Sequence, residues 1–76
     1  MTAVSELHAA SDTLRAAEHP APHYQPLADW LDAMAVEVGR RSYFWQATGQ
    51  DADALTTVLY RWPLEVARAV LAEVTV

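Results

Sequence analysis

The chain has 76 residues, and 53% of them are hydrophobic, which suffices for one small domain with a modest core. Its formal net charge is −5, from ten acidic residues against five arginines and no lysine. Such a chain lacks the basic surface that direct nucleic-acid binding needs. The absence of cysteine excludes disulfides, Cys-based zinc sites and thiol nucleophiles.

The distribution of apolar residues also bears on location. No stretch approaches the roughly 18 consecutive apolar residues of a transmembrane helix. The N-terminus lacks the basic segment followed by an apolar segment that marks a secretory signal. We therefore expect a cytoplasmic protein that forms a single domain over residues 1–76 and has no membrane contact.

Residues 2–18 are predicted to form a first helix. Thr2 is a good N-cap residue, and the alanines and leucines that follow are strong helix formers. At about 100° per residue, Leu7 and Leu14 fall on one stripe with three alanines. Because two leucines make only a thin apolar seam, this helix must pack on a neighbour to be stable.

A proline-rich break follows in residues 19–25, HPAPHYQ. Pro20 and Pro22 each push the preceding residue toward an extended conformation, so we expect a short, stiff connector that reverses the chain. Pro26 is predicted to be the first residue of the next helix, where its missing N–H costs nothing.

The dominant element is a predicted central helix over residues 26–46. Its apolar residues share one face for more than five turns: Leu27, Trp30, Leu31, Met34, Val38 and Trp45. Gly39 is a weak point within it, costing up to about 1 kcal/mol relative to alanine. We predict one continuous helix, with a bend or an early end near Gly39 as the alternative.

Two shorter helices are predicted to complete the chain. Asp51 or Asp53 can cap the third, whose apolar residues follow helical spacing: Ala54, Leu55, Val58, Leu59 and Trp62. The segment LTTVLYRW is also rich in strand-forming residues, but a lone strand would have no partner here. Pro63 is predicted to begin the fourth helix, which runs to about residue 74.

These elements predict an all-α fold, with three or four helices packed around the central one. We expect the first and fourth helices to cover the central helix and the tryptophans to be buried. The predicted core comprises Leu7, Leu14, Leu27, Trp30, Leu31, Met34, Val38, Leu55, Leu64 and Leu71.

Few residues suggest chemistry. His19 and His23 are separated by prolines, so a metal site would need His8 or a carboxylate as a third ligand, and we interpret the histidines as solvated. The pairs Asp29 with Asp32 and Asp51 with Asp53 are interpreted as surface and cap residues. The sequence holds no nucleophile elbow and no glycine-rich phosphate loop. We therefore predict no enzymatic activity and no cofactor.

A second group of side chains lies on the far side of the central helix. Aromatic and aliphatic residues there stand beside charge, which is the usual composition of a protein interface. The predicted interaction residues are Val36, Glu37, Arg40, Tyr43 and Phe44. Burial of these residues by the first or fourth helix is the alternative.

Arg41 lies one turn before Trp45 and is predicted to stack on the indole of that tryptophan. The alternative is an anion receptor formed by Arg40 and Arg41.

Two segments resemble known proteins. QPLADWLDAMA (residues 25–35) and PLEVARAVLAEV (residues 63–74) resemble parts of small Ala/Arg/Trp-rich helical proteins encoded by actinobacteria and their phages. That resemblance implies an accessory protein of a phage or mobile element and assigns no site residue.

We therefore predict a non-enzymatic protein–protein interaction module. Its partner would be a second copy of the chain or a host protein. One alternative is an acidic decoy for the nucleic-acid-binding site of another protein. Another is a small metal- or ligand-binding protein that uses its histidines.

Overall fold

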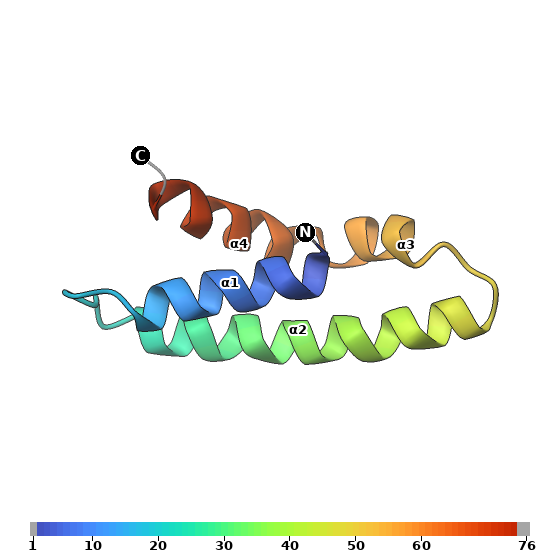
Figure 1. Ribbon diagram of the computed structural model, residues 1–76, viewed down its shortest axis with the longest axis horizontal. Coiled ribbons are helices and arrows are strands. Elements are labelled where there is room, and N and C mark those ends of the chain that lie inside the picture. The colour runs from blue at the N-terminus through green and yellow to red at the C-terminus, as the bar shows by residue number, and fades with distance from the viewer. Residues whose placement is uncertain (1, 75–76) are drawn as a thin grey trace.

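The computed structural model describes residues 2–74, and this part of the chain contains four α-helices and no strand. They are α1 (Ala3–Arg15), α2 (Tyr24–Ala47), α3 (Ala52–Leu59) and α4 (Arg61–Val74) (Figure 1). The predicted all-α class is confirmed. Residues 1, 75 and 76 of the predicted domain lie outside the described residues.

The helices form a thin, elongated bundle of 44 × 22 × 16 Å. α1 and α2 are an antiparallel hairpin, in which the longer α2 extends well past the start of α1 (Figure 1). α3 covers this projecting end of α2, and α4 returns along α1. The first and fourth helices were expected to cover the central one; α1 does so, whereas α4 touches α2 only slightly and packs mainly on α1.

Local side-chain caps fix two of the helix starts. The Thr2 hydroxyl accepts a hydrogen bond from the Ser5 backbone N–H at 3.1 Å, and Ser5 in turn caps Thr2. The Asp51 carboxylate accepts one from the Ala54 backbone N–H at 3.1 Å. Both caps agree with the sequence prediction, because each satisfies an N–H that has no partner within its helix.

Pro26 and Pro63 were predicted to be the first residues of their helices, but each is the third. α2 begins at Tyr24, two residues before Pro26, and α4 begins at Arg61, two residues before Pro63. The N–H groups of the whole first turn lack intrahelical acceptors, so proline is tolerated at several positions there and does not define the first residue. α2 is continuous through Gly39, as predicted.

The core is built from small side chains as much as from large ones. Five of its twelve buried hydrophobic residues are alanines, which let the helix axes approach closely; the twelve are Leu7, Ala10, Leu14, Ala28, Leu31, Ala35, Val38, Trp45, Ala52, Tyr60, Leu64 and Ala67. Leu27, Met34, Leu55 and Leu71 are half-buried around it. The expected burial of two tryptophans was wrong: Trp30 is 38% exposed and Trp62 is 68% exposed.

A polar clamp sets the register of the α1–α2 hairpin. The Arg15 guanidinium lies 2.5 Å from the Asp32 carboxylate and 2.7 Å from that of Asp29, and it also donates to the Ser11 hydroxyl. His8 Nδ1 lies 3.4 Å from Asp32 Oδ1. The carboxylates keep the Arg15 pKa above its ordinary value, so this cation stays charged while it bridges the two helices.

We expect the clamp to make stability depend on pH in the acid range. Partial burial would raise the pKa of Asp32, but hydrogen bonds from Ser11 and Arg15 and the Arg15 charge outweigh it and lower that pKa below 3.8. A lowered folded-state pKa stabilises the protein above the unfolded value, and the contribution is lost as the pH falls through the folded pKa.

The free energy of unfolding, measured by urea denaturation at a series of pH values, should therefore fall below about pH 4. Asp32→Asn should flatten that part of the curve, whereas Asp12→Asn, at an exposed acid on α1, should leave the curve close to wild type. Equal acid slopes in wild type and Asp32→Asn would contradict the role given to Asp32.

Candidate interaction surface

Four of the five predicted interaction residues are exposed on α2. Val36, Tyr43 and Phe44 are 52%, 78% and 61% exposed, and Arg40 is exposed beside them. The alternative that another helix buries these residues was therefore wrong. Their spacing along α2 sets them on neighbouring turns of one side, so they form a continuous stripe.

Glu37 has a different role from its four neighbours. It is half-buried and its carboxylate lies 3.3 Å from Arg41 Nε, while the same carboxylate acts on the hydroxyl of buried Tyr60. Burial and the nearby Glu37 carboxylate raise the pKa of Tyr60. The contact ties the α3–α4 junction to α2.

Arg41 was predicted to stack on the indole of Trp45. The arginine that lies over an indole is instead Arg61, whose guanidinium carbon is 5.3 Å from the centre of the Trp62 ring.

Sequence analysis missed a second group of exposed side chains. Val58, Leu59 and Trp62 are 73%, 59% and 68% exposed. The sequence indicated burial for Trp62, and it gave Val58 and Leu59 only as apolar residues at helical spacing. The side of α3 that packs inward carries Ala52 and Thr56, followed by Tyr60. The helix therefore has two apolar sides, and the one with the larger side chains faces solvent.

Helix periodicity indicates that the exposed residues of α2, α3 and the start of α4 share the side of the molecule opposite the start of α1. Near the start of α1, Thr2 and Ala3 line shallow hollows together with Ser42 and Gln46 of α2 and with Asp53, Thr56, Thr57 and Leu64. A residue two positions away lies about 200° around a helix, on the opposite side. Phe44 is two positions from both Ser42 and Gln46, Leu59 is two positions from Thr57, and Trp62 is two positions from Leu64. Each of these three side chains therefore lies on the side of its helix opposite the hollows.

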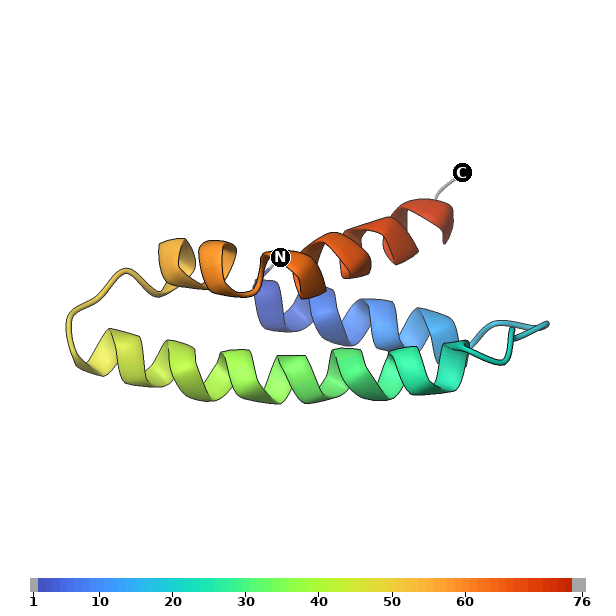
Figure 2. The same ribbon diagram turned by 180° about the vertical axis from the view of Figure 1, so that it is seen from behind.

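We name this side the open face and define it as Phe44, Leu55, Leu59 and Trp62, with Val36, Tyr43 and Val58 at its borders. Figure 2 shows the molecule from the side on which α1 lies behind α2 and α4. Six of these seven side chains are between 52% and 78% exposed, and Leu55 is half-buried. From ordinary side-chain sizes, the seven together expose on the order of 700 Å² of apolar surface.

The polar residues elsewhere do not assemble into a recognisable reactive site. His8 contacts Asp32, and the His23 ring packs edge-on against Tyr24 at 5.0 Å. Within residues 2–74, no three His, Asp or Glu side chains are placed to hold a metal ion. Over the same range, no helix combines the length and the apolarity needed to cross a bilayer.

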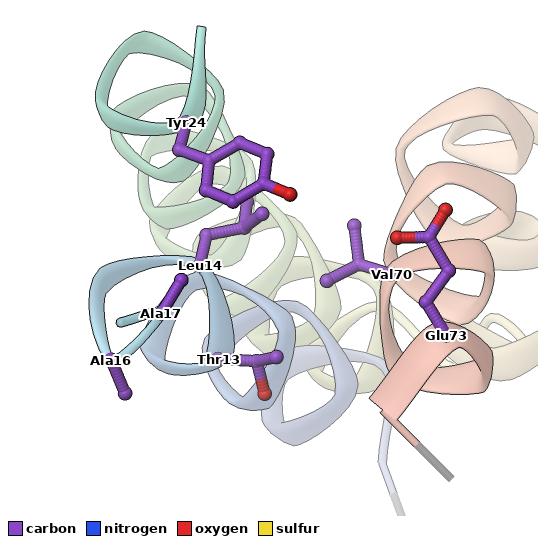
Figure 3. A pocket seen from close by; sticks show the side chains of 7 residues that line it. All are labelled: Thr13, Leu14, Ala16, Ala17, Tyr24, Val70 and Glu73. Carbon is purple, nitrogen blue, oxygen red and sulfur yellow. The ribbon is translucent and has the colours of Figure 1, made fainter. Parts of the chain in front are cut away.

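An apolar cleft opens at the other end of the molecule, where α4 diverges from α1. Its volume is about 350 Å³, and its lining is Thr13, Leu14, Ala16, Ala17, Tyr24, Val70 and Glu73. In Figure 3 the side chains of Tyr24 and Leu14 lie on one side and that of Val70 on the other, with the Glu73 carboxylate at the outer edge. Hydrocarbon walls of this kind favour apolar groups without selecting a particular ligand.

Comparisons with protein-family models, curated proteins and solved structures give no match to this chain. Among the residues that the structure describes, the open face holds six of the seven exposed large hydrophobic side chains.

Proposed function

We propose that the protein is a non-enzymatic protein–protein interaction module that acts through the open face. The observation that carries the proposal is the exposure of Phe44 on α2, Leu59 on α3 and Trp62 at the start of α4. Large apolar side chains gathered in this way on a small domain are typical of surfaces that a partner covers. The partner is a second copy or a host protein, and a phage or mobile-element origin would suit the latter.

The composition of the open face supports an interface. Binding energy in interfaces is concentrated in aromatic and arginine side chains. Phe44 and Trp62 are such aromatics, and Arg61 lies over the Trp62 ring while Arg40 stands at the border. All of them are on helices, so little ordering entropy is lost when a partner binds.

The acidic surface supports the decoy hypothesis less well. A phosphate-like row needs free carboxylates, but Asp29 and Asp32 share the guanidinium of Arg15. Glu6 is likewise held by Arg68 at 3.2 Å, which joins α1 to α4. These acids stabilise the fold, which leaves the open face as the better-supported binding surface.

Site-specific photocross-linking tests the function. A photoreactive amino acid at Leu59 should cross-link the protein, in the cells that produce it, to one discrete partner. The same amino acid at Thr57, on the opposite side of α3, is the matched control and should not. The product could be a second copy or a foreign protein, and its mass tells which.

A double variant supplies the second test. Tyr43→Asp with Phe44→Asp should stay folded, because both side chains are exposed, and should lose the product of cross-linking at Leu59. Cross-linking that is equal at positions 57 and 59, or is unchanged in the double variant, would refute an interaction through the open face. Unfolding of the double variant would show that these residues belong to the core.

A further inference from the structure

We propose that the partner of the open face is a second copy of this chain, packed about a two-fold axis. This inference rests on the proposed function and adds the identity of the partner. Both α2 and α3 would lie in the dimer interface, and α1 of each copy would remain on the outside. Such an isologous contact buries the same residues on both partners, so the two open faces are covered at once.

The size of the open face fits a dimer. A stable interface buries about 800 Å² per partner, and the exposed apolar area of the open face and its borders is on the order of 700 Å². The rim of polar atoms around those side chains would make up the remainder. The open face of each copy is therefore large enough to form one half of a stable dimer interface.

The charge distribution also favours self-association at this side. Two copies that each carry −5 repel one another unless they meet where the charge is low. Residues 36–65 contain four acids and three arginines, for a net charge of −1, which leaves −4 for the rest of the chain. The acids are Glu37, Asp51, Asp53 and Glu65, and the arginines are Arg40, Arg41 and Arg61.

Arg40 adds a polar contact at the border. Within residues 2–74, the other four arginines each have an ion-pair partner, whereas Arg40 has none. Its side chain is exposed on the turn between Val36 and Phe44. In a two-fold dimer it is free to pair with a carboxylate of the other copy, and the symmetry would form the contact twice.

Light scattering on the purified full chain, over a range of concentrations, tests the proposal. The wild type should show twice the 8.4 kDa mass of one chain. Leu59→Asp should shift it to a monomer that keeps its helical circular dichroism, because a buried unpaired carboxylate would destabilise the interface. Thr57→Asp places the same charge on the other side of α3 and should leave the dimer intact.

A second measurement avoids dependence on a charged variant. The chain has no cysteine, so Leu59→Cys and Thr57→Cys each carry one thiol. A short bis-maleimide should join two copies of the first variant and not of the second.

The outcomes separate this inference from the proposed function. A wild type that stays monomeric at all concentrations overturns the dimer, while a foreign cross-link at position 59 would still support the interaction module. A dimer that Leu59→Asp does not weaken and that cross-links no better at 59 than at 57 overturns the assignment of the open face itself.

Discussion

Leu31→Ala should destabilise the protein by about 2–5 kcal/mol, whereas the neighbouring Trp30→Ala should cost less, about 1 kcal/mol. Leu31 is fully buried in α2, so truncation leaves a cavity as well as removing apolar contact. Trp30 is 38% exposed, and water can fill the space that its ring leaves. The larger residue should therefore have the smaller effect.

Urea denaturation of both variants measures this difference, with thermal melting as a second reading. A domain of this size has a total stability of roughly 4–11 kcal/mol, so the Leu31 change removes a large share of it. Each kcal/mol should lower Tm by about 4–8 °C. A Trp30→Ala variant that is less stable than Leu31→Ala would show that the indole, and not Leu31, lies at the centre of the core.

The helices and their caps were predictable because their signals are local. Thr2 and Asp51 satisfy backbone N–H groups within three residues of themselves, so sequence alone identifies them. The proline-rich connector and the single long α2 follow from equally local preferences. What these signals leave open is which side of each helix faces its neighbours.

The burial of Trp30 was predicted wrongly because the buried side of α2 includes alanines. The predicted buried side of α2 was defined by large residues alone: Leu27, Trp30, Leu31, Met34, Val38 and Trp45. In the structure, Ala28 and Ala35 are buried as fully as Leu31. Alanine occurs both in cores and on helix surfaces, so it gives little directional signal in sequence. Because α1 packs closely over these alanines, the buried side of α2 is centred on them, and Trp30 lies at its margin.

The candidate surface was predictable only in part, for a related reason. On α2, Val36 and Tyr43 are opposite the long apolar stripe, so their exposure followed from that stripe. On α3, Leu59 was recognised only as an apolar residue at helical spacing, and Leu55 was the residue assigned to the core. Eight residues are too few to decide between the two sides, and the decision comes from α2, which contacts the side with Thr56 and Tyr60.

Ala35→Leu should destabilise the protein by about 1–3 kcal/mol through overpacking. Ala35 is 1% exposed and lies one turn from both Asp32, which the α1 residue Arg15 binds, and Gly39, which Val4 of α1 approaches. It therefore faces α1. Three additional carbon atoms at that position must push α1 away or force strained side-chain rotamers.

Ala33→Leu is the matched control, since Ala33 is an exposed position on the same helix. Leucine and alanine have similar helix propensities, so the control should change stability by no more than about 0.5 kcal/mol. Urea denaturation compares the two, and a backbone NMR spectrum should show shifts at Ala35→Leu that extend into α1. Equal stabilities in the two variants would mean that α1 and α2 leave room for a leucine, and that the alanines do not set their spacing.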